Sequence, residues 1–145
     1  MTDTIKGGCL CGAVNYKVSE PFALSVDCFC TDCRKTSGTG HGTHCITNDS
    51  QFSLNGTTRN YEKEADSGHM ITRHFCGECG SPIFSLNKGM PGMIAIRASS
   101  LEDTSHANPS LSVFTSSAPS WDQPHVEPAF EHMPPANVRP DPAEA

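Results

Sequence analysis

The chain has 145 residues with 16 acidic and 10 basic side chains, and its formal net charge is −6 at pH 7. This length suits one domain, and the acidic balance disfavours a nucleic-acid partner, whose affinity comes mainly from phosphate neutralisation. No segment approaches the ~20 apolar residues of a membrane span, and the amino-terminal residues lack the apolar run of a signal peptide. We therefore expect a cytoplasmic protein whose eight cysteines are reduced and available as metal ligands.

Short strands separated by turns are expected along most of the chain. Alternating apolar and polar residues predict strands over residues 13–18, 23–26, 41–46, 52–54, 57–63, 69–75, 81–86 and 93–97. Residues 34–40 are expected to form a polar turn, residues 103–126 an irregular segment, and the proline-rich residues 133–145 a disordered tail. No amphipathic helix is evident, so the pattern predicts an all-β domain over residues 1–132.

Seven of the cysteines form three groups whose spacing is typical of zinc sites. The pairs Cys9/Cys11 and Cys76/Cys79 would together supply four thiolates to one closed structural zinc. The triplet Cys28, Cys30 and Cys33 would fit a tight loop and hold a second zinc with one open coordination position, as catalytic sites do. The alternatives for the triplet are disulfide chemistry or inert buried thiols.

Cys45 stands apart from these groups, in the segment His44-Cys45-Ile46-Thr47. Its position in the alternation predicts an inward-facing core side chain, because free cysteine is among the most buried residue types. The alternative is that Cys45 is a fourth ligand of the second metal, which would then have no open position.

Three cysteine motifs carry a resemblance to a known family. They are Gly-x-Cys-x-Cys-Gly at residues 7–12, Cys-x-Cys-x-x-Cys-Arg-x-x-x-Gly at 28–38 and Arg-x-Phe-Cys-x-x-Cys-Gly at 73–80. In combination they resemble the glutathione-dependent formaldehyde-activating (GFA) family, or CENP-V/GFA domain, from about Gly7 to Phe130. The resemblance implies an Mss4-like fold of short antiparallel sheets with two zinc ions. It matches Cys9, Cys11, Cys76 and Cys79 to structural ligands and Cys28, Cys30 and Cys33 to the catalytic ones.

An open zinc with three thiolates suits a soft fourth ligand, and a substrate thiol is the natural candidate. The family resemblance implies a carbon–sulfur lyase that forms or cleaves S-hydroxymethylglutathione from glutathione and formaldehyde. The expected partner is therefore a small thiol or thiol adduct, with no nucleic acid and no membrane. The alternative function is a non-catalytic, zinc-scaffolded binding module, because one fold serves many functions.

Residues near the triplet are candidates for substrate contacts. Arg34 and Lys35 follow Cys33 directly and could bind an acidic substrate, or they could belong to a solvated turn. One of His41 and His44 could face the metal pocket, although a satisfied or exposed histidine is the more common case.

Other polar and aromatic side chains are expected to be structural. Arg73 is expected to brace a carbonyl or a carboxylate, and His69 and His74 are expected at the surface of a strand. Trp121 and Phe114 could line a pocket, although large aromatic side chains in a small β protein usually pack in the core.

Overall fold

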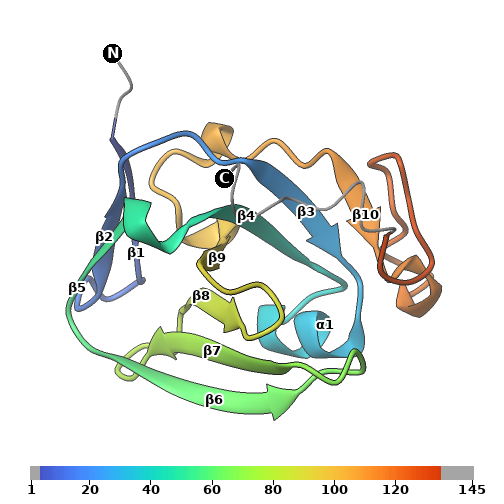
Figure 1. Cartoon of the computed structure of the whole chain (residues 1–145), viewed down its shortest axis with the longest axis horizontal. Coiled ribbons are helices and arrows are strands. Elements are labelled where there is room, and N and C mark those ends of the chain that lie inside the picture. Colours follow the sequence, from blue (N-terminus) through green and yellow to red (C-terminus); the bar gives the residue numbers. More distant parts are fainter. Residues whose placement is uncertain (1–3, 135–145) are drawn as a thin grey trace.

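The computed structural model describes residues 4–134 and has two β-sheets and one α-helix (Figure 1). The small sheet, at the left of Figure 1, has the order β1-β2-β5, formed by Ile5–Gly8, Asn15–Val18 and Phe52–Asn55. The large sheet has the order β10-β3-β4-β9-β8-β7-β6. The all-β prediction is therefore confirmed.

The strands of the large sheet follow the expected segments closely, with one addition. They are β3 (Leu24–Cys28), β4 (Gly42–Asn48), β6 (Thr58–Glu64), β7 (Met70–Cys76), β8 (Pro82–Asn87), β9 (Met93–Arg97) and β10 (Leu111–Val113). The strands that the sequence did not predict are β1, which ends in two glycines, and β10, which lies within the segment expected to be irregular. β10 pairs parallel with β3, whereas every other strand pair of the two sheets is antiparallel among the described residues.

A seven-residue helix, α1 (Thr31–Ser37), replaces the predicted polar turn. Its first turn contains Asp32, and Gly38 closes its carboxyl end with φ 76°, the left-handed conformation that glycine adopts readily. The sequence carried these end signals, but two turns of helix are too short to show an apolar periodicity. The expectation of a tight loop around the cysteine triplet is therefore wrong, because the triplet joins the end of β3 to the beginning of α1.

Asn55-Gly56, which is typical of a two-residue hairpin, has a different role here. Gly56 has φ 100°, and a Cβ at this position would lie 2.3 Å from the Ala13 carbonyl oxygen. The turn leads from β5 in the small sheet to β6 at the edge of the large sheet. It therefore connects the two sheets rather than two paired strands.

The main core lies between the sheets and contains buried side chains from both of them. Among its members are Val14, Tyr16, Val18, Cys45, Ile83 and Ile96, each with no more than 2% of its surface exposed. A second, smaller cluster contains Cys28, Cys33, Leu111 and Val113, against which Phe114 and Phe130 pack. The cysteine triplet is therefore part of a small apolar cluster at the β10 side of the large sheet.

Trp121 and His74 lie where the sequence did not place them. Trp121 is 68% exposed, because it belongs to a loop between β10 and the strand-like bridge at Ala129 and not to a strand facing the core. His74 is half-buried: its ring stacks on Phe84 with centroids 4.4 Å apart, and its Nδ1 lies 2.9 Å from Thr58 Oγ1. His69 is exposed, as expected.

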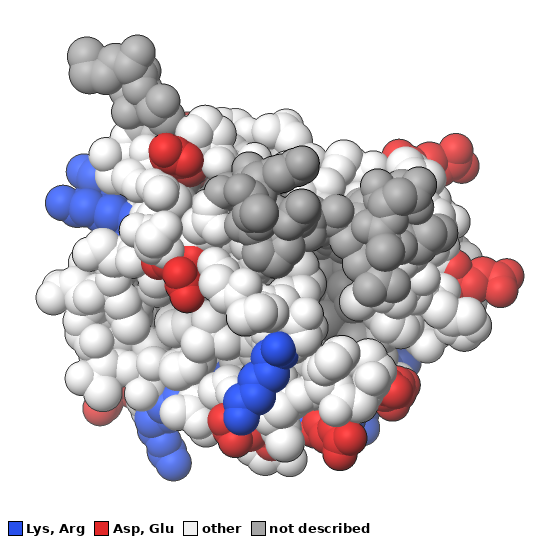
Figure 2. All heavy atoms as spheres, viewed as in Figure 1, with Lys and Arg blue, Asp and Glu red and all other residues white. Residues whose placement is uncertain are grey.

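No helix among residues 4–134 is long and apolar enough to cross a bilayer. On the face seen in Figure 2, the basic side chains are scattered apart from an adjoining group at the upper left, and acidic side chains lie among them. The expected disordered tail lies almost entirely outside the described residues; of it, Met133 and Pro134 are described.

Candidate metal and thiol site

The structure brings the cysteines together in the two groups expected from their spacing. The thiol sulfurs of Cys9, Cys11, Cys76 and Cys79 all lie within 4.8 Å of one another, and so do those of Cys28, Cys30 and Cys33. All eight cysteines are free thiols. The cysteines therefore form no disulfide bonds, and either group could hold a metal ion.

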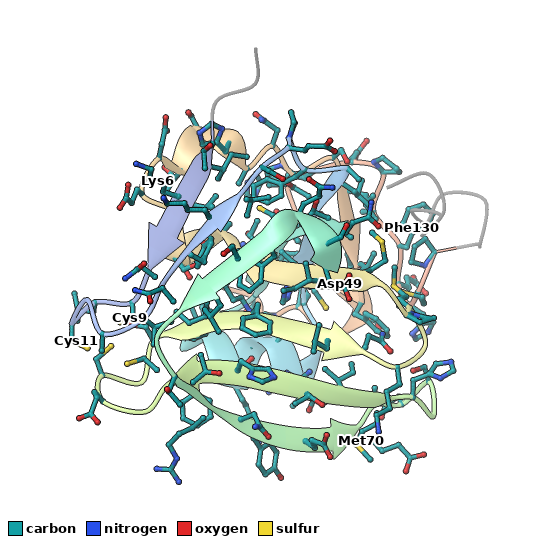
Figure 3. All side chains as sticks on the ribbon, turned by 60° about the vertical axis from the view of Figure 1, so that its left-hand side comes forward. Lys6, Cys9, Cys11, Asp49, Met70 and Phe130 are labelled. Atoms are coloured by element: carbon teal, nitrogen blue, oxygen red, sulfur yellow. The ribbon has the colours of Figure 1, made fainter. Side chains whose placement is uncertain are left out.

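The first group joins two turns that are far apart in the sequence. Figure 3 shows Cys9 and Cys11 in the turn between β1 and β2, whereas Cys76 ends β7 and Cys79 lies in the turn between β7 and β8. The sulfurs of Cys9 and Cys11 are 3.6 Å apart, and those of Cys11 and Cys76 are 3.7 Å apart. Four thiolates around zinc at about 2.3 Å would have edges of about 3.8 Å, so these separations fit a tetrahedral site with four cysteine ligands.

Backbone and hydroxyl groups around the first group favour thiolates. The Val14 amide donates to Cys9 Sγ at 3.2 Å, and the Glu78 amide donates to Cys76 Sγ at 3.4 Å. A hydrogen bond with the Ser81 hydroxyl, reinforced by backbone amides, lowers the pKa of Cys79 to about 5. Hydrogen bonds to the charged sulfur prepare the site for a cation.

The triplet is arranged by the junction of β3 and α1. Cys28 is the last residue of β3, Cys30 caps the amino end of α1, and Cys33 lies in its first turn. The Cys33 amide donates to Cys30 Sγ at 3.3 Å, as the N-cap position requires. The Phe29 amide between them donates to the Val113 carbonyl of β10, which holds the backbone between Cys28 and Cys30. The three sulfurs converge because a strand end and a helix start meet at one point.

The three thiols of the triplet compete for one negative charge. The neighbouring thiols of Cys28 and Cys33 lower the pKa of Cys30 to about 2. Hydrogen bonding to Cys30 and Cys33, together with burial, raises the pKa of Cys28 well above its usual range. Three thiolates this close are stable together only beside a cation, and a bound divalent metal deprotonates its thiol ligands outright. The donor set therefore fits a zinc ion.

His44 is the histidine that faces the triplet. Its Nε2 lies 3.3 Å from Cys33 Sγ, and its Nδ1 is buried without a hydrogen-bond partner among the described residues. Burial, followed by the charge of Arg97, lowers the pKa of His44 to about 3, so the imidazole is neutral at pH 7. His41 is engaged elsewhere, because its Nδ1 lies 2.6 Å from Asp122 Oδ2 and its ring packs on Phe29.

Two arginines from the large sheet lie near the triplet. Arg97 of β9 is 6% exposed, and its guanidinium donates to Thr36 Oγ1 of α1. Arg73 of β7 is 14% exposed, and its guanidinium lies 4.0 Å from Asp32 Oδ2. Sequence reasoning assigned Arg73 a structural role and did not single out Arg97, because strand pairing alone places both beside α1.

A cavity of about 190 Å³ opens at the triplet. Cys28, Cys33, His44 and Arg73 line it, and the rest of its wall is mostly aliphatic. Arg34 and Lys35 lie in the last turn of α1, and neither lines this cavity. Their predicted role in substrate binding remains a prediction.

Cys45 belongs to the main core. Its side chain is fully buried in β4, and its sulfur accepts a hydrogen bond from Ser25 Oγ at 3.6 Å. It is part of neither cysteine group. The prediction of a core side chain is confirmed, and the triplet has no fourth thiol from this position.

A family model and a curated relative point to the same family, and a solved structure shares the fold. The family model described as glutathione-dependent formaldehyde-activating enzyme matches residues 4–117. A protein of Halomonas elongata named for glutathione-dependent formaldehyde activation is 30% identical over 106 residues, which cover 68% of this chain and 66% of that protein. A crystal structure of a Rhodobacter sphaeroides protein has a similar fold, with a TM-score of 0.55 and 24% identity over 67% of this chain and 87% of that one.

Proposed function

Because the chain belongs to the glutathione-dependent formaldehyde-activating enzyme family, we propose that it is a zinc-dependent carbon–sulfur lyase. Its reaction is the formation or cleavage of a thiol–aldehyde adduct such as S-hydroxymethylglutathione. The observation that carries the proposal is a group of three convergent thiols, without a fourth, beside a cavity. The reduced thiols that this site needs suit the cytoplasm.

The two cysteine groups take different roles in this proposal. Cys9, Cys11, Cys76 and Cys79 hold a structural zinc, and Cys28, Cys30 and Cys33 hold the zinc at which substrate binds. A zinc ion with three thiolate ligands supplies an open position that lowers the pKa of an incoming thiol and holds its sulfur in the nucleophilic form. The α1 amino end and β10 hold the backbone around the three sulfurs, and Cys28 and Cys33 line the cavity through which a substrate thiol would reach the metal.

The reaction balances without a further reactant. In the forming direction, the thiol sulfur bonds to the aldehyde carbon, and the carbonyl π electrons move to oxygen. The proton that the thiol gives up ends on that oxygen, and cleavage is the reverse. No oxidant or reductant is needed.

His44 is placed to orient the adduct. A thiolate at Cys33 can only accept, so Nε2 of the neutral imidazole must donate to it across their 3.3 Å separation. Nδ1 then carries a lone pair, which can accept a hydrogen bond from the hydroxyl of the adduct. His44 lines the same cavity as Cys28 and Cys33, which is where the adduct would lie.

The test compares zinc content with turnover in the same preparation. Cys30→Ser should leave the protein folded with about one zinc and abolish adduct formation, because the first cysteine group uses other turns. Positioning of a nucleophile is worth on the order of 7–11 kcal/mol in favourable cases, so the loss should be large. Cys45→Ala is the matched control: it also removes a buried thiol, and it should keep both metals and the activity.

Two results would contradict the proposal. One is full activity in Cys30→Ser after loss of one zinc, which would make that metal structural. The other is a wild-type protein that turns over no thiol–aldehyde pair and whose second zinc takes up no added thiol. The second result would favour a zinc-scaffolded binding module.

A further inference from the structure

The cavity at the triplet points to a particular kind of thiol. Building on the proposed function, we infer that the site selects thiol adducts with a short aliphatic body and one terminal carboxylate. The sulfur would lie at the triplet, the aliphatic body against the cavity wall, and the carboxylate on Arg73. Glutathione would then be a poor fit.

The aliphatic wall is one face of the large sheet. Alternate residues along a strand point to the same face, and the lining residues follow this spacing in strand after strand. They include Leu24 and Val26 of β3, Ile46 of β4, Ile71 of β7, and Leu111 and Val113 of β10. The opposite face of β4 and of its neighbour β9 contributes Cys45 and Ile96 to the main core. On β3 and β10 the opposite face instead carries the buried polar side chains Ser25, Asp27 and Ser112, so beside the triplet the aliphatic surface is on the cavity face.

The charges of the wall do not match glutathione. Glutathione carries two carboxylates and one ammonium group, and each needs a partner when it leaves water. Arg73 is the only arginine or lysine that lines the cavity, and no aspartate or glutamate lines it within residues 4–134. The ammonium group would lack a counter-charge, and one carboxylate would lack a cation.

The size of the cavity also favours a thiol smaller than glutathione. Pockets that enclose drug-sized ligands usually measure roughly 300–1,000 Å³. The cavity at the triplet measures about 190 Å³. It suits a chain of a few carbons better than a tripeptide.

Arg73 is available for a carboxylate. Its contact with Asp32 is 4.0 Å long, whereas Lys63 Nζ holds the same carboxylate at 2.9 and 3.1 Å. Lys63 therefore already neutralises Asp32. A mostly buried guanidinium with unused donors can bind a carboxylate through two parallel hydrogen bonds. The other arginine near the triplet, Arg97, donates to Thr36 instead.

The experiment measures thiol binding to the zinc-containing protein by calorimetry, without turnover. The probes are ω-mercaptocarboxylates of three to six carbons, the alkanethiols of the same lengths, and glutathione. The best mercaptocarboxylate should bind at least about tenfold more tightly than glutathione and than its matched alkanethiol. A tenfold ratio corresponds to about 1.4 kcal/mol, which is within the range of one charge-assisted contact.

Matched variants separate the contributions. Arg73→Gln should weaken mercaptocarboxylate binding about tenfold or more and leave alkanethiol binding unchanged. Arg59→Gln is the control, because Arg59 is an exposed arginine of β6 that does not line the cavity. Ile71→Thr should weaken both classes of thiol, because it places a hydroxyl in the aliphatic wall.

The inference is wrong if glutathione binds as tightly as the best mercaptocarboxylate, if Arg73→Gln weakens all thiols equally, or if no thiol binds. A failure of this inference can be distinguished from a failure of the proposed lyase function. Selective binding without turnover would support this inference and contradict the lyase. Turnover of glutathione and formaldehyde without the expected binding selectivity would support the lyase and contradict this inference.

Discussion

Neighbouring residues of one strand have opposite roles at this site. His44 and Cys45 are adjacent in β4, yet His44 contacts Cys33 and Cys45 packs in the main core. The period of two along a strand produces this separation.

Buried polar side chains on the core side have their own hydrogen-bond partners. Ser100 Oγ donates to the Arg97 carbonyl at 2.7 Å, so the Tyr16 hydroxyl, 2.6 Å away, must be the donor to Ser100.

Tyr16 should make the protein sensitive to alkaline pH. Burial raises the pKa of its hydroxyl to about 12, above the value of about 10 for an unfolded chain. The unfolded state therefore loses this proton first, and stability falls as the pH rises from about 10 to 12. The contribution is at most about 2.7 kcal/mol, for a difference of about two pKa units.

Urea titrations of the wild type and Tyr16→Phe would measure this effect. At pH 7 the variant should be less stable by about 0.5–1.5 kcal/mol, because it lacks the hydrogen bond to Ser100. Above pH 10 the difference should shrink and then reverse. Tyr61→Phe is the control, because Tyr61 is 63% exposed. A wild-type minus Tyr16→Phe difference that stays constant from pH 7 to 12 would refute the argument.

α1 is the element that positions the triplet, and its stability comes from its ends and neighbours. A seven-residue helix is not stable alone in water. Here the Cys30 side chain caps the amino end of the helix, and Gly38 closes its carboxyl end. Asp32 pairs with Lys63 of the edge strand β6, and Thr36 accepts a hydrogen bond from Arg97 of β9. The geometry of two of the three sulfurs therefore depends on contacts outside the triplet.

Gly38→Ala should destabilise the protein through backbone conformation alone. A Cβ at Gly38 would meet no atom within 4 Å, but φ is 76° there. The left-handed conformation costs an alanine roughly 1–2 kcal/mol, whereas asparagine tolerates it better. Chemical denaturation should therefore rank the wild type first, Gly38→Asn second and Gly38→Ala last. Equal losses in the two variants would show that the cost lies elsewhere.

For the whole molecule, the first cysteine group fastens the small sheet to the large one. Cys9 and Cys11 follow β1, whereas Cys76 ends β7 and Cys79 lies in the turn before β8. In the proposed holoprotein, one zinc ion closes this link over a long stretch of chain. Binding free energy at a site that the unfolded chain lacks becomes folding free energy.

Cys76→Ser should therefore lower the melting temperature sharply or prevent folding, whereas Cys30→Ser should stay folded. Circular dichroism melts and zinc analysis of the two variants would test this contrast. Cys45→Ala should cost only on the order of 1–2 kcal/mol for a small core truncation, and it should keep its full zinc content. Unchanged melting of Cys76→Ser would contradict the structural role of the first group.

Local patterns determined much of this protein. The alternation of apolar residues located eight of the ten strands, and the spacing of the cysteines predicted which thiols come together. Both signals depend on neighbours within a few residues. Side chains along a strand return to the same face every two residues, and two ligands from one turn must lie one to three residues apart in the sequence. The buried position of Cys45 followed from the same alternation.

Contacts between distant segments decided the rest. α1 and β10 are too short to leave a periodic pattern, and β10 exists because β3 offers it an edge. Three further features depend on which strands lie side by side. They are the exposure of Trp121, the contact of His44 with Cys33, and the aliphatic cavity that Arg73 lines. The order of strands in the large sheet is a property of tertiary packing, because backbone pairing is the same for every sequence and only the packed side chains select the partners.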